Sequence, residues 1–198
     1  VSILGNAELA SFHIEKDSPA WEHLEVLQKG GVRAANLTNQ LLAYAGHRHL
    51  ETCVLDMNES VRDIVQLLHT AVVRKARVRY ELGSGLPPIE ADPAQLEQVI
   101  LNLLTNAADS LSGQPGKVTI RTGVEEIESN TTRKTIQGDR LPVGRYVFLE
   151  VEDTGCGMDS TIQAQMFDPF YTTKEKGRGL GLAAMQGIIR SHSGAIDV

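Results

Sequence analysis

A carboxylate and two groups of glycines are the residues of this chain best suited to holding a nucleotide. Asp153 ends an alternating apolar run, and the sequence TGCG that follows it breaks the strand predicted by that run. Glycines at such a break let a ligand approach the backbone, with Asp153 fixed beside it as a hydrogen-bond acceptor. The glycine-rich stretch 177–181 then precedes a helical pattern, so free N–H groups at the helix start can face phosphate oxygens. These features predict a nucleotide site other than a Walker loop, because G-x-x-x-x-G-K-[ST] does not occur.

An earlier helix carries amide side chains on one side. Asp92, followed by proline and by glutamine three positions later, is a strong helix start. Asn102 and Asn106 lie one turn apart on this helix, in a stripe with Gln98 and Asp109. Amides on a mostly apolar helix are costly to bury unless they are hydrogen-bonded. Two interpretations are open at this point: the amides bridge neighbouring loops, or they bind a ligand.

Together with the sequence FDPFYTTK at 167–174, these motifs resemble the glycine boxes, N box and F box of the Bergerat-type (GHKL) ATPases and kinases. The resemblance is strongest to the sensor histidine kinases, and it covers nearly the whole chain. It implies that Asp153 accepts a hydrogen bond from the adenine amino group. It also implies that Gly155 and Gly157 let the base approach.

The resemblance also implies which residues bind ATP and Mg²⁺. Asn102 is expected to ligate Mg²⁺, and Asn106 to bind the phosphates. Lys174 and Arg178 can reach the triphosphate as cations, although solvated loop charges are the alternative. The backbone expected to wrap the phosphates is that of Gly179, Leu180 and Gly181.

Two positions bear on the reaction. Asp109 stands where many members of the family carry a basic residue, three positions after Asn106, so a phosphate contact from that position is not supported. In the hydrolase branches a glutamate that activates water stands where this chain has Asn102. Asparagine cannot act as a general base, which favours phosphoryl transfer to a protein side chain over hydrolysis.

The expected function is therefore ATP-dependent histidine autophosphorylation in a two-component system, followed by transfer to an aspartate of a response-regulator receiver domain. One alternative is a GHKL-type ATPase or protein kinase of another branch. Another is a catalytically silent dimerisation module that senses nucleotide.

The phosphoacceptor is not evident in the chain. Family acceptors lie in an H-[ED]-x-x-N box, and no histidine of this chain has that context: His13, His23, His47, His49, His69 and His192. We expect the acceptor upstream of Val1, in a chain truncated at both ends.

The fold class expected is α+β, with two domains. Residues 1–49 are expected to form a helical hairpin, with helices over 2–14 and 21–49 and a linker beginning at His47. Periodicity alone favours a hairpin packed within one globule, whereas the resemblance implies dimerisation as a four-helix bundle. Residues 50–198 are expected to form a two-layer α/β sandwich that binds ATP. The seam of the second helix is predicted at Leu24, Leu27, Gly31, Ala34, Thr38, Leu41 and Ala45.

Within the second domain the pattern predicts alternating strands and helices. A strand at 53–55 precedes a helix capped by Asn58 and ending near Ala76. The later strands are predicted at 78–82, 118–126, 145–153 and 195–198. A polar segment at 129–144 separates two of them, and a helix from Leu182 ends at His192.

Composition limits the partners. A net charge of −6 and a pI near 5.5 argue against broad binding to nucleic acid or anionic membranes, so the anion site must be local. No apolar run approaches the roughly 18 residues of a membrane span. Cys53 and Cys156 fit neither a disulfide framework nor a zinc pattern, which predicts reduced thiols and a cytoplasmic location. A membrane anchor elsewhere in a full-length protein is compatible with this.

Overall fold

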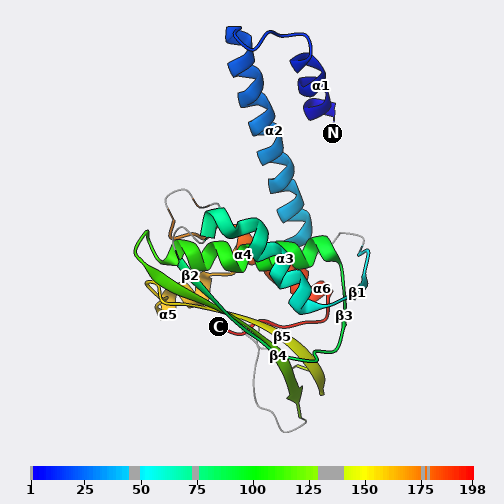
Figure 1. Cartoon of the computed structure of the whole chain (residues 1–198), viewed down its shortest axis with the longest axis vertical. Helices are drawn as coiled ribbons and strands as arrows, with labels where there is room; N and C mark the ends of the chain where they lie inside the picture. Colours follow the sequence, from blue (N-terminus) through cyan, green and yellow to red (C-terminus); the bar gives the residue numbers. More distant parts are fainter. Residues whose placement is uncertain (1, 45–49, 73–75, 129–140, 175–176, 178) are drawn as a thin grey trace.

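A helical hairpin projects from a mixed α/β body (Figure 1). The computed structural model describes residues 2–44, 50–72, 76–128, 141–174, 177 and 179–198. Most of the predicted linker, which begins at His47, and most of the polar segment 129–144 lie outside the described residues. None of the described helices has the length and the apolar composition that a membrane span requires.

The hairpin consists of α1 (Ser2–Ser11) and α2 (Pro19–Tyr44), which pack against each other along part of their length. Gly31 allows a close approach, because a Cβ on it would lie 2.7 Å from Leu4 Cδ2. Leu24 is buried, but Leu27 is 58% exposed. The predicted seam therefore does not form one buried face within a single chain. Of the remaining seam residues, Gly31 is half-buried, Ala34 and Thr38 are exposed, and the side chain of Leu41 and all of Ala45 lie outside the described part.

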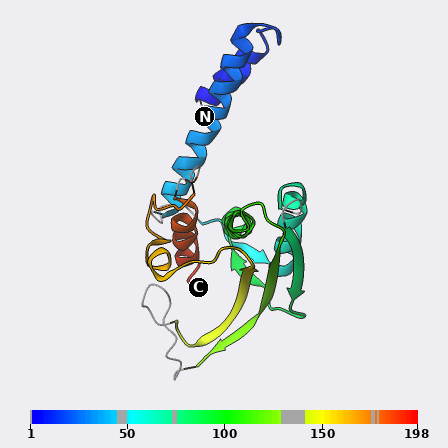
Figure 2. The same ribbon diagram turned by 90° about the vertical axis from the view of Figure 1, so that its left-hand side faces the viewer.

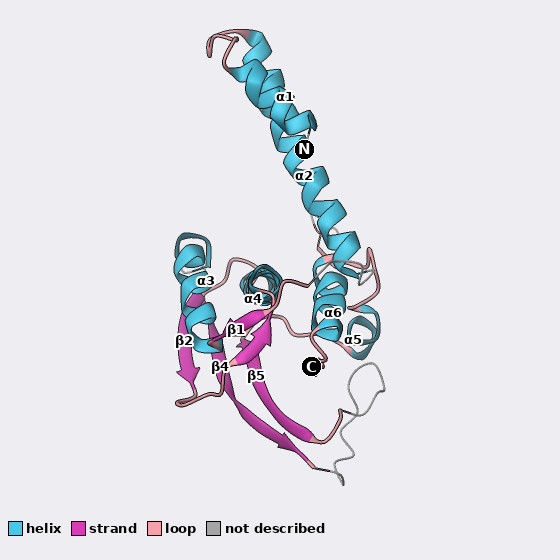
Figure 3. Cartoon of the chain, turned by 90° about the vertical axis from the view of Figure 1, so that its right-hand side faces the viewer, coloured by secondary structure: helices cyan, strands magenta, loops and turns pink. Residues whose placement is uncertain are grey.

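The body has three helices over one face of a three-stranded sheet (Figures 2 and 3). The helices are α3 (Met57–Val72), α4 (Pro93–Ser110) and α6 (Gly181–Ser191), and the end of α2 lies beside α6. In the sheet, β2 (Ala76–Leu82) is parallel to β4 (Gly116–Ile127), which is antiparallel to β5 (Gly144–Asp153). A separate antiparallel pair is formed by β1 (Cys53–Leu55) and β3 (Ile89–Ala91), and a short α5 (Ser160–Gln165) precedes α6.

Helix α4 belongs to two apolar cores. Ile100 and Leu104 pack with α3 and the sheet, where Val118 and Ile120 are fully buried. Val99, on another side of the same helix, packs with residues before and within α6. Full burial of each such side chain contributes roughly 1.5–3 kcal/mol. The two cores fix the rotation of α4, so its remaining polar side faces the loops between them.

The predicted cap of α4 is confirmed, and the predicted cap of α3 is wrong. Asp92 Oδ1 accepts from the backbone N–H of Gln95 at 3.1 Å. At α3 it is Asp56, not Asn58, whose carboxylate accepts from the first amides, those of residues 58 and 59, at 2.7 and 3.1 Å. The Asn58 side chain points inward instead, donating to Gly83 O and accepting from Thr122 Oγ1.

Other predicted boundaries shift. The first helix ends at Ser11, where a turn bonds Phe12 N to Leu9 O at 3.2 Å. The predicted strand at 195–198 is not formed, because it pairs with no strand in the described part of the chain. Neither β3 nor α5 was expected. Cys53 and Cys156 are free cysteines, and both are exposed.

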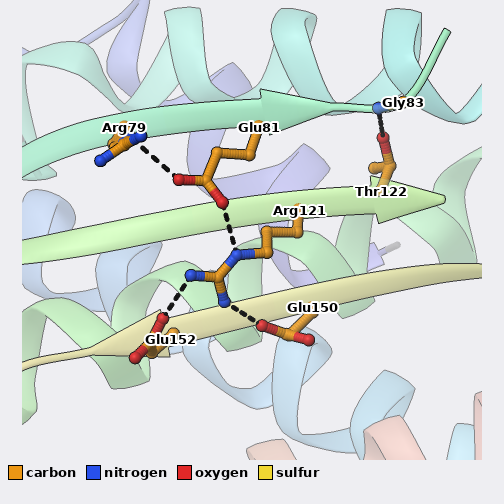
Figure 4. A network of polar contacts seen from close by, with 7 residues as sticks. All are labelled: Arg79, Glu81, Gly83, Arg121, Thr122, Glu150 and Glu152. Atoms are coloured by element: carbon orange, nitrogen blue, oxygen red, sulfur yellow. Dashed lines mark hydrogen bonds and ion pairs between the residues drawn. The ribbon is translucent and has the colours of Figure 1, made fainter.

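The outer face of the sheet, away from the helices, carries an ion network (Figure 4). The Arg121 guanidinium bonds Glu81 at 2.6 Å, Glu152 at 2.7 Å and also Glu150. Arg79 contacts the other oxygen of Glu81 at 2.9 Å. The hydrogen bond from Arg121 lowers the pKa of Glu81, and the carboxylates raise the pKa of Arg121. This face is therefore polar and is not a second core.

Candidate functional site

Three polar side chains at four-residue intervals on α4 each meet a different segment of the chain. Asn102 Nδ2 donates to Gly181 O at 3.0 Å, and Asn106 Oδ1 accepts from Lys174 Nζ at 2.8 Å. Ser110 Oγ donates to Asp153 Oδ1 at 2.6 Å. A rise of 1.5 Å per residue spreads these contacts over about 12 Å of helix. The glycine boxes, the end of the F box and the N box thus converge along one face of α4.

Asp153 is held with one oxygen engaged and one available. Its Oδ1 accepts from Ser110 Oγ and from the backbone N–H of Gly155 at 2.8 Å. Its Oδ2 accepts a hydrogen bond from no residue within the described ranges. The Asp153 side chain is half-buried. The strand end is extended by Thr154, whose backbone N–H donates to Lys117 O at 3.1 Å. The carboxylate therefore offers a fixed acceptor to a ligand beside it.

The two glycines after Asp153 serve different purposes. A Cβ on Gly155 would lie 2.2 Å from Ser110 Oγ and 2.6 Å from the Ser110 carbonyl carbon, so this position packs against the end of α4. Cys156 N also donates to Ser110 O at 3.2 Å. Gly157 has a φ of +66° and no atom within 4 Å of its Cβ position, so its requirement is conformational.

The second glycine group, at 177–181, packs closely against the F box and is hydrogen-bonded to it. Gly179 has a φ of +65°, and a Cβ on it would lie 2.3 Å from the Phe170 carbonyl carbon. Phe170 N donates to Gly179 O at 2.8 Å. Leu180, at the N-cap of α6, is buried and has no side chain that could cap the helix, so Gly181 begins the helix with amides that have no intrahelical partner. These amides can face an anion.

The environment of Asn102 fits a magnesium ligand. Because its Nδ2 is bonded to Gly181 O, the amide oxygen is the end left for a cation. Mg²⁺ prefers oxygen ligands and usually retains substrate phosphates and waters in its shell. Within the described residues, no group of three or more His, Cys, Asp or Glu side chains could hold a metal ion by itself. A divalent ion at Asn102 would therefore depend on oxygens brought by the nucleotide.

Sequence reasoning missed one residue of the site, Ser110, and one contact within it. Ser110 continues the four-residue spacing from Asn106, so the same periodicity could have identified it. Lys174 Nζ also bonds Asp109 Oδ2 at 2.9 Å, a pair 65 positions apart for which a single sequence gives no signal. Arg178, the other predicted cation, lies outside the described residues.

Comparison with known proteins identifies a family and relatives. Residues 91–198 match the family described as histidine kinase-, DNA gyrase B-, and HSP90-like ATPase. The chain is 35% identical to the sensor kinase CckA of Brucella abortus over 197 residues, 98% of this chain and 20% of that protein. It is 37% identical to the signal transduction histidine-protein kinase AtoS of Escherichia coli over 179 residues, 89% of this chain and 26% of that protein. The chain thus spans a fifth to about a quarter of these relatives.

Solved structures share the fold. Full-length ShkA in complex with AMPPNP has a TM-score of 0.69 at 24% identity, covering 96% of this chain and 37% of that one. The histidine kinase ThkA in complex with the response regulator protein TrrA has a TM-score of 0.59 at 22% identity, covering 98% of this chain and 51% of that one. The mixed α/β body and the hairpin beside it therefore follow an arrangement found in these proteins.

Proposed function

The chain belongs to the histidine kinase-, DNA gyrase B- and HSP90-like ATPase family, and from this premise we propose that its site binds ATP with Mg²⁺ for phosphoryl transfer to a protein histidine. The observation that carries the proposal is the convergence of Asn102, Asn106 and Asp153 with the Gly181 end of α6 along one face of α4. The names of the relatives, a sensor kinase and a histidine-protein kinase, favour the histidine kinase branch.

Each site residue is assigned to a different part of the nucleotide. Asp153 accepts from the adenine amino group through its available oxygen, and Gly155 and Gly157 shape the loop beside the base. Asn106 binds phosphate oxygens, while Asn102 ligates Mg²⁺ with its amide oxygen. Lys174 and Arg178 supply positive charge, and the phosphates lie against the backbone of Gly179, Leu180 and Gly181.

The reaction proposed is transfer and not hydrolysis. Asn102 offers an amide at the position from which a carboxylate would activate water, and an amide cannot accept that proton. Phosphoryl transfer requires mainly that donor and acceptor be positioned in line and that charge be stabilised. The fixed amides and cations of the site can supply both for a histidine presented to the γ-phosphate.

The proposal extends to domains and partners. We assign residues 1–49 to a hairpin that dimerises as a four-helix bundle and 50–198 to the catalytic domain, a two-layer α/β sandwich placed in the cytoplasm. Exposed apolar side chains on the hairpin support dimerisation, with Ile3 70% and Phe12 76% exposed in the single chain. A response-regulator receiver domain is the proposed acceptor of the phosphoryl group, which the ThkA–TrrA complex supports by analogy. The phosphoacceptor histidine upstream of Val1 stays a prediction.

Two measurements test the function. In calorimetric titrations, the affinity for ATP should be higher with Mg²⁺ than without it. The affinity for ATP should also be higher than the affinity for GTP. A polypeptide extended upstream of Val1 should then take label from γ-labelled ATP as an acid-labile, base-stable phosphohistidine, whereas residues 1–198 alone should not. Release of phosphate without any labelled protein would instead favour the ATPase branch. Absence of ATP binding would overturn the assignment of the site.

A further inference from the structure

The ammonium group of Lys174 lies between two side chains of α4. Its Nζ is 2.8 Å from Asn106 Oδ1 and 2.9 Å from Asp109 Oδ2. The lysine backbone is held by a local turn, in which Lys174 N donates to Thr172 Oγ1 at 3.1 Å and Gly177 N donates to Lys174 O at 3.0 Å. A charge from the end of the F box is thereby placed beside the amide assigned to the phosphates.

We propose that Asp109 is a positioning residue that holds Lys174 beside Asn106 to receive a nucleotide phosphate. This inference rests on the proposed function of the site. The ammonium has three N–H donors, and the two contacts with α4 use two of them. The third donor is left for a phosphate oxygen, so Lys174 can bind phosphate without leaving Asp109.

The pair also explains the departure of the N box from the family pattern. Asp109 occupies a position where a basic residue would contact phosphate directly. By itself its carboxylate would repel a triphosphate, since like charges a few ångströms apart repel even near a protein surface. With Lys174 bound, the position instead presents the positive charge of a residue 65 positions later in the chain. Asp109 thus acts on the nucleotide only through Lys174.

A different role for Asp109, as a competitor of the nucleotide, predicts the opposite effect on affinity. If Asp109 competed with nucleotide for Lys174, removing the carboxylate would release the lysine and strengthen binding. The effect of Asp109→Asn on nucleotide affinity, measured with and without the lysine, therefore decides between a positioning residue and a competitor.

The test is a double-mutant cycle on the whole chain, with the affinity for ADP plus Mg²⁺ measured by calorimetry. Lys174→Met should weaken binding about tenfold, the loss of one charge-assisted hydrogen bond. Asp109→Asn should weaken it about threefold in the parent, consistent with an exposed ion pair. In the Lys174→Met background Asp109→Asn should leave the affinity unchanged or improve it, because the lone carboxylate then only repels phosphate.

Two controls separate this role from a structural one. Adenosine lacks phosphates, so its affinity should be equal in the parent and all three variants. The Lys29–Glu25 pair on α2, with the same 2.9 Å separation, is a matched control, and Lys29→Met and Glu25→Gln should leave ADP binding unchanged.

Several results would overturn the inference. They are tighter ADP binding by Asp109→Asn in the parent, equal losses from Asp109→Asn in both backgrounds, or a parallel loss of adenosine affinity. If the parent binds adenosine and ADP while the cycle shows no coupling, only the inference fails. If the parent binds neither, the proposed function fails and the inference fails with it.

Discussion

Asn102 and Gly181, 79 positions apart in the chain, are joined by a hydrogen bond of 3.0 Å from the amide Nδ2 to the glycine carbonyl oxygen. This bond ties the middle of α4 to the first residue of α6. It also fixes which end of the Asn102 amide remains for a cation. One side chain therefore has both a structural and a proposed metal-binding role.

Replacing Asn102 with alanine should separate these roles. The lost hydrogen bond should lower the free energy of unfolding by about 1 kcal/mol. The affinity for ATP should become nearly the same with Mg²⁺ as with a chelator, which calorimetry can measure. Gln98→Ala, a change on the same polar stripe, is the control and should retain the magnesium dependence. A full magnesium dependence in Asn102→Ala would refute the metal assignment.

Asp153→Asn should weaken ATP binding by roughly tenfold or more, because a charge-assisted hydrogen bond to the base is lost. The asparagine oxygen can still accept from Ser110 and Gly155, so the unfolding midpoint should change little. Selection of ATP over GTP should also decrease, as a comparison of the two affinities will show. Asp63→Asn on the exposed side of α3 is the charge control. Unchanged affinity and selectivity would disprove the role of Asp153.

Gly155→Ala should destabilise the fold by about 3 kcal/mol or more, since the new methyl group would meet the α4 backbone at Ser110. Gly85→Ala is a matched control at a φ of +65° with open space around the Cβ position. That change should cost only about 1–2 kcal/mol, the strain of a left-handed backbone. A loss in chemical denaturation no larger than that of Gly85→Ala would mean that the end of α4 moves to accept the methyl group, and would contradict a packing requirement at Gly155.

Glu81→Gln should lower stability at neutral pH but not in acid. The folded pKa of Glu81 is lowered by its hydrogen bond from Arg121, so its contribution is present above the ordinary glutamate pKa of about 4.3 and is lost as pH falls through the lowered value. Denaturant midpoints of parent and variant should therefore differ at pH 7 and converge below pH ~4. Glu97→Gln, an exposed carboxyl on α4, controls for the loss of one charge. A constant difference at all pH values would contradict this origin.

Leu27→Glu should weaken the proposed dimer. The side chain is 58% exposed in the single chain, and Val26 beside it is 68% exposed, which is apolar surface that a second hairpin can cover. Sedimentation should give a dimer for the parent and a shift toward monomer for the variant. Ala20→Glu places the same charge in the first turn of α2, where it suits the helix dipole, and should leave the dimer intact. A monomeric parent would argue against the bundle for this length of chain.

The parts of the site that follow from local spacing were predictable from the sequence. The Asp92 cap, the Asn102–Asn106 stripe and the glycines after Asp153 all depend on residues within one or two turns of one another. Contacts between distant segments were not predictable, since nothing in one sequence pairs Lys174 with Asp109 or aims Asn58 at Thr122.

Predicted boundaries failed where two neighbouring residues could serve the same purpose. Asp56 and Asn58 are both good cap residues, and the choice between them depends on where the chain leaves β1. The predicted strand at 195–198 needed a neighbouring strand, which local pattern cannot supply. Which residues of the predicted seam are buried within one chain was not predictable for a related reason, because the direction that each hairpin residue faces depends on where α1 packs.

The parallel pairing of β2 with β4 has a consequence for the rate of folding. Strands β4 and β5 are antiparallel neighbours in sequence, whereas β2 can reach β4 only after the whole of 83–115, with α4 inside it, has been closed into a loop. Such non-local closure is entropically costly, and its cost must be met before the β2–β4 contacts can form, so it contributes to the folding barrier. We therefore expect a shortened 83–115 connection to speed refolding more than it slows unfolding, which stopped-flow measurements can check.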